Sequence, residues 1–271
     1  MTAREELVAL VAPERPDGSV ELARAALLIA AEEYPQLRPE PYIQRLDYLA
    51  ERVRDHLGDE SAAPVVLGET SRLLFEEEGF RGNAEAYYDP RNSYLNDVLD
   101  RKLGIPLTLG IIYLEIGWRL GLPLHGVNFP GHFMVRYQGE ALRLLVDPYH
   151  GGQIRFEDQA QELLDRVYGG SVKLQPEYLR TSSRRDILVR LLSNLKTIHM
   201  NARDDARALA AVERILLLRP EATEELRDRG MLLARLDRID EAITALQDYL
   251  DMAPSARDVT RIQLLIDELR K

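Results

Sequence analysis

The sequence predicts an α+β protein whose C-terminal third is an all-α array of helical repeats. Three observations lead to this fold class. Apolar residues recur at helical spacing up to residue 78, the period shortens towards two between residues 126 and 147, and a 34-residue helical repeat follows residue 184. A small antiparallel sheet is therefore expected between two helical regions.

Three amphipathic helices are predicted in the N-terminal region, each closed by a residue that disfavours continuation of a helix. Pro35 ends the first, Gly58 the second and Gly79 the third. Their predicted ranges are 20–34, 42–57 and 65–78. Residues 80–93 are rich in Gly, Asn, Tyr and Pro, which predicts an ordered loop.

A buried helix and a small sheet are predicted in the middle of the chain. A short helix capped by Asn92 or Ser93 runs to Lys102, and Gly104-Ile105-Pro106 separates it from a strongly apolar helix over 107–120. Beyond that helix the alternation of apolar and polar residues predicts antiparallel strands over residues 126–129, 132–137 and 141–147.

The C-terminal region carries an internal repeat. A shift by 34 residues superposes Ala208 on Ala242 and Pro220 on Pro254, and 34 residues is the tetratricopeptide period. The small alanines allow two antiparallel helices to approach closely, and the prolines end the second helix of each repeat. The predicted helices are two hairpins, 184–200 with 204–218 and 223–236 with 239–252, and a capping helix over 255–270.

Composition excludes several classes of function. Cysteine is absent, which removes disulfides, thiolate metal ligands and any cysteine nucleophile. The net charge is −10 and no run of Lys or Arg occurs, which argues against nucleic-acid binding. No apolar run reaches the roughly 20 residues of a membrane span, and the N-terminus lacks the layout of a signal peptide. We therefore expect a cytoplasmic protein without nucleic-acid or membrane partners.

Four motifs resemble the SirB1-type family, which joins a transglutaminase-like core to C-terminal tetratricopeptide repeats. The motifs are Asn92–Leu99, Gly104–Leu109, Gly126–Phe133 and Asp147–Tyr149. The resemblance implies that residues 1–180 form a helical region with a transglutaminase-like (papain-like) core, whose motif-bearing part is 87–154. It also implies that residues 181–271 form tetratricopeptide-like repeats.

The resemblance further implies a triad, because the superfamily's core supplies Cys from a helix N-terminus, His from one strand and Asp from the next. His132 and Asp147 match the last two positions. No cysteine exists, and the matching helix start offers Thr108 as the hydroxyl. The sequence favours two structural roles for Thr108 over a nucleophile: a helix cap that accepts from the N–H of Gly110 or Ile111, or a packed hydroxyl. It also favours a structural His132–Asp147 pair over a working base.

The sequence offers further candidate residues for a cleft and for a metal site. Tyr88, Asn92 and Asn128 are candidates for lining a cleft near the triad-like residues. Two more histidines, His125 and His150, could be grouped with the His–Asp pair as metal ligands. Their spacing along the chain is not that of a tight metal motif, so the sequence predicts neither a metal site nor a cofactor.

Two classes of function follow. The favoured one is a degenerate, non-catalytic transglutaminase-like protein that acts as a protein-interaction or regulatory scaffold through its core cleft and its repeats, because the nucleophile is missing. The alternative is an amide-bond hydrolase or acyl transferase with Thr108 as nucleophile, His132 as base and Asp147 as orienting acid. The repeats imply a protein or peptide partner, or a lid within the chain, and leave the oligomeric state open.

Overall fold

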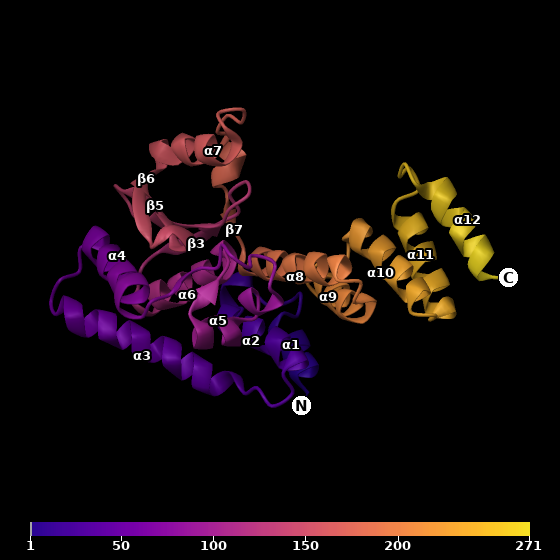
Figure 1. The fold of residues 1–271 in the computed structure, drawn as a ribbon, viewed down its shortest axis with the longest axis horizontal. Coiled ribbons are helices and arrows are strands. Elements are labelled where there is room, and N and C mark those ends of the chain that lie inside the picture. Colours follow the sequence, from indigo (N-terminus) through magenta and orange to yellow (C-terminus); the bar gives the residue numbers. More distant parts are fainter. Residues whose placement is uncertain (1) are drawn as a thin grey trace. The chain divides into compact units, whose positions relative to one another are not determined.

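A computed structural model describes residues 2–271 and has the α+β class that the sequence predicts (Figure 1). The chain divides into two compact units. The core unit comprises Arg15–Leu188 with the N-terminal residues up to Leu10, and the array unit comprises Val189–Lys271 with Val11–Glu14. All strands within residues 2–271 belong to the core unit. In the same residues, no helix is both long enough and apolar enough to cross a bilayer.

The N-terminal part of the core unit is helical. Its helices are α1 (Ala3–Leu10), α2 (Leu22–Glu33), α3 (Pro39–Leu57) and α4 (Ala63–Ser71), and α4 continues as the π-helical turn η2 (Arg72–Glu77). The three predicted helices correspond to α2, α3 and α4 with η2. The sequence prediction does not include α1, whose eight residues span barely two turns.

The sheet of the core unit is antiparallel with the strand order β6-β5-β4-β3-β7. Its strands are β3 (Leu124–Val127), β4 (Met134–Gln138), β5 (Arg143–Asp147), β6 (Gln153–Phe156) and β7 (Thr181–Ser182). The three predicted strands correspond to β3, β4 and β5. The two edge strands are not predicted, because they are short and carry little apolar alternation.

One helix covers each face of this sheet, α6 (Pro106–Arg119) and α7 (Ala160–Tyr168) (Figure 1). On the α6 side, a Cβ atom at Gly110 would lie 2.4 Å from the Phe133 ring, so the missing side chain lets helix and ring meet. On the α7 side, strand residues pack against one apolar face of the helix; this cluster contains Val127, Phe129, Met134, Leu145, Ala160, Leu163 and Leu164.

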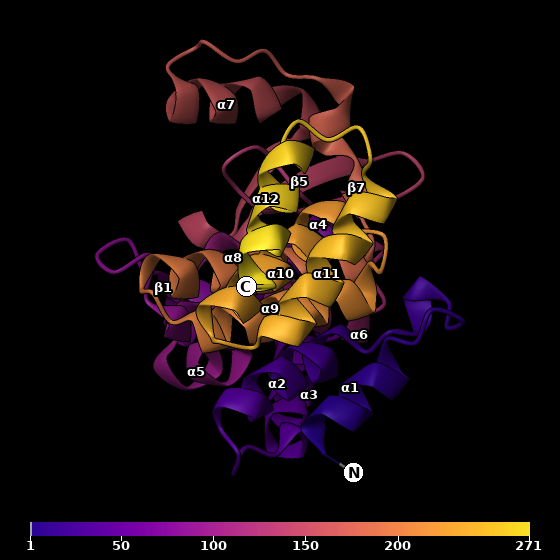
Figure 2. The ribbon, with the colours of Figure 1, turned by 90° about the vertical axis from the view of Figure 1, so that its right-hand side faces the viewer.

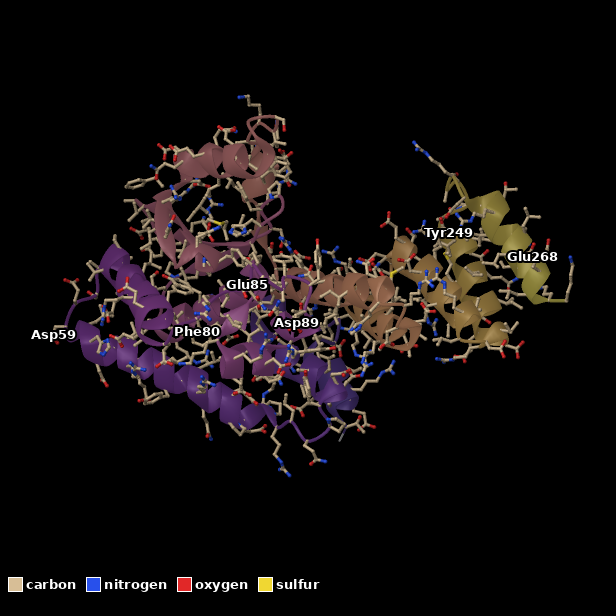
Figure 3. All side chains as sticks on the ribbon, viewed as in Figure 1. Asp59, Phe80, Glu85, Asp89, Tyr249 and Glu268 are labelled. Atoms are coloured by element: carbon tan, nitrogen blue, oxygen red, sulfur yellow. The ribbon has the colours of Figure 1, made fainter. Side chains whose placement is uncertain are left out.

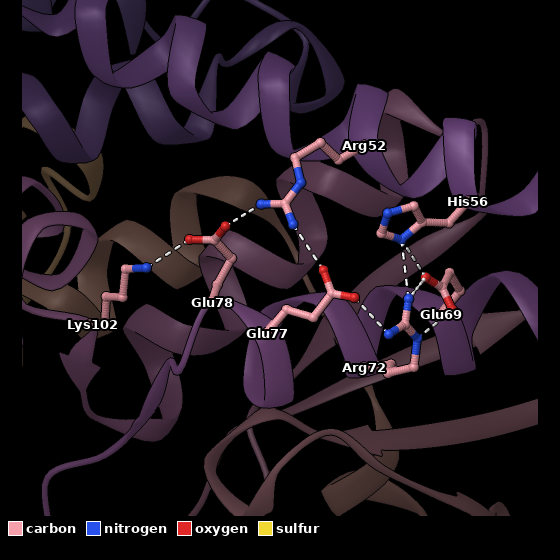
Figure 4. Close-up of polar contacts among 7 residues, drawn as sticks. All are labelled: Arg52, His56, Glu69, Arg72, Glu77, Glu78 and Lys102. Carbon is pink, nitrogen blue, oxygen red and sulfur yellow. Dashed lines mark hydrogen bonds and ion pairs between the residues drawn. The ribbon is translucent and has the colours of Figure 1, made fainter.

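A network of ion pairs joins α3 to the segments that follow it (Figure 4). Arg52 contacts both Glu77 and Glu78, and Lys102 Nζ donates to Glu78 Oε2 at 2.6 Å. Lys102 follows α5 (Leu95–Arg101) and precedes β2 (Leu103–Gly104), which pairs in parallel with β1 (Arg81–Gly82). Ion pairs that remain partly exposed contribute little stability individually, so the network mainly fixes how these segments meet.

The array unit consists of antiparallel helices, and neighbouring helices lie side by side (Figure 2). The helices are α8 (Arg184–Asn201), α9 (Asp205–Leu218), α10 (Thr223–Arg235), α11 (Ile239–Met252) and α12 (Val259–Leu269), and the first turn of α8 belongs to the core unit. The repeated alanines Ala208 and Ala242 are fully buried in one apolar cluster. Tyr249, labelled in Figure 3, donates its hydroxyl to Asp258 and thereby ties α11 to the start of α12.

Substitution of Lys196 by methionine is expected to lower the free energy of unfolding by about 1–2 kcal/mol. Lys196 Nζ donates to Glu225 at 2.7 Å and to Asp228 at 3.1 Å. Burial lowers the pKa of Lys196, but these two hydrogen bonds and charges raise it further, so the pKa lies above its ordinary value. Methionine would leave Glu225 without its cation, whereas Asp228 keeps its ion pair with Arg227 at 3.3 Å. Urea denaturation measures the loss, with Lys173→Met at an exposed lysine as control; equal losses in both variants would contradict this role.

Candidate active site

Asn92 holds together the loop that connects β1 to α5. The side chain is fully buried. Its amide oxygen accepts from Asn83 Nδ2 at 3.0 Å, and its amide nitrogen donates to the carbonyl oxygens of Ala86 at 2.7 Å and Tyr87 at 3.2 Å. Glu85 and Asp89, labelled in Figure 3, lie on this loop. Asn92 therefore organises the loop from inside, and it does not cap α5, whose N-cap is Tyr94.

Thr108 lies at the third position of α6 and is fully buried. Its hydroxyl donates to the carbonyl oxygen of Asn92 at 2.7 Å and accepts from the backbone N–H of Ile105 at 3.1 Å. The predicted acceptance from Gly110 or Ile111 is wrong, because Pro106 starts the helix earlier and Thr108 reaches back to the N-cap residue. In the described residues, no hydrogen bond of Thr108 leads to His132.

His132 and Asp147 form a close pair. His132 Nε2 lies 2.8 Å from Asp147 Oδ1, and both side chains are buried. The sequence places His132 at the start of a strand, which is wrong by two residues. The chain turns at Gly131, whose φ is +66°, and the His132 N–H donates to the Phe129 carbonyl, so β4 begins only at Met134.

A second imidazole, that of His150, reaches the same carboxylate. Its Nδ1 lies 2.8 Å from Asp147 Oδ2, in the 3-10 turn η4 (Pro148–His150) that follows β5 directly. The backbone N–H groups of Tyr149 and His150 also donate to Asp147 Oδ1, each at 3.2 Å. The sequence names His150 only as a member of a metal cluster that its spacing disfavours, although the Asp-Pro-Tyr-His order places this histidine three residues after the aspartate on a tight turn. His125 instead lies exposed on β3.

Aromatic rings flank the two histidines. The Tyr149 ring lies edge-on to His132 at 6.0 Å and to His150 at 5.2 Å between ring centroids. A Cβ atom at Gly82 would lie 2.3 Å from the Tyr149 ring, so the glycine lets this ring lie against β1. Tyr87 continues the row, and the predicted cleft residue Tyr88 contacts it edge-on. Tyr88 and the predicted cleft residue Asn128 are both exposed.

The carboxyl group of Asp147 is held as an anion. Its burial raises the pKa, but the hydrogen bonds and charges of His132 and His150 outweigh burial, so the pKa lies below its ordinary value of 3.8. A group with a depressed pKa stabilises the fold above its unfolded-state pKa and loses this contribution as pH falls through the folded-state value.

The free energy of unfolding of the wild-type chain is therefore expected to exceed that of an Asp147→Asn variant. This difference should be largest above about pH 4 and should shrink as pH falls further. Urea denaturation at a series of pH values measures this difference. Asp158→Asn, at an exposed aspartate of the same unit, is the matched control and should show no such trend. An advantage of Asp147 that stays constant from pH 6 to pH 2 would contradict the charged pairing.

Comparisons with known proteins agree with this arrangement. A model described as the transglutaminase-like superfamily matches residues 40–193, and one described as a tetratricopeptide repeat matches residues 195–267. UPF0162 proteins are 38% identical in Xylella fastidiosa, over 91% of this chain and 89% of the relative, and 35% identical in Pseudomonas aeruginosa, over 88% and 85%. Protein SirB1 of Salmonella typhimurium is 30% identical over 78% of this chain and 82% of its own. The chain belongs to the SirB1 (UPF0162) family.

In this SirB1-family chain, the fold brings together two of the three side chains that the superfamily's triad order implies. His132 and Asp147 have the distance that a base and its orienting acid require. The third, Thr108, directs its hydroxyl to Asn92 and Ile105 instead. The SirB1-family core thus combines a formed His–Asp pair with a buried hydroxyl that is already fully engaged.

Proposed function

We propose that this protein is a non-catalytic member of the transglutaminase-like superfamily that acts as a protein-interaction scaffold. The observation that carries the proposal is the state of Thr108. A nucleophile must present its oxygen to a base and to a substrate carbonyl. The Thr108 hydroxyl is fully buried, and it donates its proton to the Asn92 carbonyl rather than to an imidazole.

The array unit supplies a surface for a partner. A groove of about 630 Å³ lies between α10 and α12. Apolar side chains of both helices line it, and charged side chains flank them; the lining residues are Met231, Ala234, Arg235, Arg261, Leu264, Leu265, Glu268 and Leu269. Leu264 is 60% exposed. An apolar groove with charged edges suits an amphipathic peptide segment of a partner protein.

A peptide-display selection against the full-length chain tests this surface. We expect amphipathic peptides to be selected and their binding to be abolished by Leu264→Glu. Tyr48→Glu, at an equally exposed side chain of α3, is the matched control and should leave binding unchanged. The scaffold proposal fails for this groove if the selected peptides bind the Leu264→Glu variant with wild-type affinity.

One observation favours the alternative function of an amide-bond hydrolase or acyl transferase: the 2.8 Å pair of His132 and Asp147. Acylation separates the two functions. The chain is incubated with p-nitrophenyl acetate, and peptide mapping by mass spectrometry locates acetyl groups. We expect no acetyl group on Thr108. Acetylation of Thr108 that disappears in His132→Gln would establish a nucleophile–base pair and overturn the non-catalytic assignment.

A further inference from the structure

We propose that His132, Asp147 and His150 form a binding site for one first-row divalent metal ion, best suited to Zn²⁺. One ring nitrogen of each histidine and one carboxylate oxygen of the aspartate lie within 4.8 Å of one another. Two imidazoles and one carboxylate are a recurrent ligand set for zinc and for other divalent transition metals. The proposal is independent of the scaffold function.

The distances suit an ion of this size. Metal–nitrogen and metal–oxygen bonds of about 2.0–2.2 Å place tetrahedral ligand atoms about 3.3 Å apart. Both imidazoles lie 2.8 Å from the carboxylate, so small side-chain rotations suffice to admit an ion between the three groups. An imidazole nitrogen that donates a hydrogen bond to the carboxylate must first give up this proton, to its own second ring nitrogen or to solvent, before it can bind the metal.

The backbone holds the three ligands in place. Asp147 ends β5 and His150 follows on the turn η4, whose N–H groups orient the carboxylate. His132 comes from the turn before β4, and β4 pairs with β5 next to the site, where Val135 faces Val146. Backbone donors that orient a ligating carboxylate are a common support of protein metal sites.

The charge of the site also favours a cation. In residues 2–271, the ion pairs of Asp147 are made to His132 and His150, and neither Lys nor Arg neutralises its carboxylate. In the form that binds a metal, with neutral imidazoles and an ionised carboxylate, these three ligands offer one net negative charge to a divalent ion.

The site opens towards solvent on one side. The His150 side chain is 58% exposed, whereas His132 and Asp147 are buried. An ion can therefore enter past His150. Three protein ligands leave a fourth tetrahedral position for water or for a ligand from outside the chain.

Isothermal titration of the tag-free, full-length chain with Zn²⁺ tests the site. We expect one ion per chain. His150→Gln should weaken binding at least tenfold, because it removes one of the three ligands. Asp147→Asn should also weaken binding, and substitution with Co²⁺ should give the visible absorption of a four-coordinate ion.

His125→Gln is the matched control, an exposed histidine of the same sheet that lies outside the cluster. It should bind Zn²⁺ as the wild type does. Wild-type binding by His150→Gln, equal weakening in His125→Gln, or no binding by the wild type would each overturn the metal site. None of these outcomes affects the scaffold proposal, which is tested separately by the absence of Thr108 acetylation and by peptide binding.

Discussion

Replacing Phe133 by alanine is expected to lower the free energy of unfolding of the core unit by about 3–5 kcal/mol. The ring is completely buried between α6 and the sheet. It occupies the space left by two glycines, since a Cβ atom would lie 2.4 Å from the ring at Gly110 and 2.6 Å at Gly126. Alanine would leave a cavity that these rigid backbone segments cannot close. Urea denaturation followed by circular dichroism measures the change.

Two further variants distinguish a packing effect from a general loss of aromatic surface. Phe156→Ala removes an exposed ring from the edge strand of the same sheet and should change stability by no more than about 0.5 kcal/mol. Gly110→Ala should destabilise the wild type by overpacking, yet cost less in the Phe133→Ala background, because its methyl group then enters the cavity. Strictly additive losses would show that ring and glycine do not share this space.

Replacing Thr108 by valine is expected to lower the free energy of unfolding by about 2–4 kcal/mol. Valine keeps the shape of threonine but removes the hydroxyl that bridges the Asn92 carbonyl and the Ile105 N–H. Both backbone groups would remain buried without this partner, and an unsatisfied buried group costs about 1–3 kcal/mol. Thermal and urea denaturation give the loss directly.

Thr108→Ser is the matched control, since serine retains the hydroxyl and loses only a methyl group. It should recover most of the stability that valine loses. If valine and serine destabilise equally, the hydroxyl does not tie the helix start to the loop, and the argument against a nucleophilic Thr108 loses its main support.

The helical elements show where sequence patterns suffice. The 34-residue spacing of Ala208 and Ala242 predicts the helix pairs of the array, because close helix approach requires small residues at fixed intervals. The apolar run over 107–120 predicts a buried helix, because a helix that is apolar on most sides must be shielded from water. The edge strand β6 and the helix α7 are not predicted from the sequence. The position of β6 depends on its pairing with β5, and that of α7 on the sheet face it packs against.

The α+β class, the repeat array and the pairing of His132 with Asp147 could be predicted from the residues, because helical periods, a fixed repeat and a family's motif order are all local or linear signals. The groups that surround this pair could not be predicted in that way. His150 reaches the carboxylate through the turn after β5, and the Thr108 hydroxyl meets the carbonyl of Asn92, 16 residues earlier in the chain. Such contacts depend on where backbone segments cross in space, and spacing along the chain does not encode that.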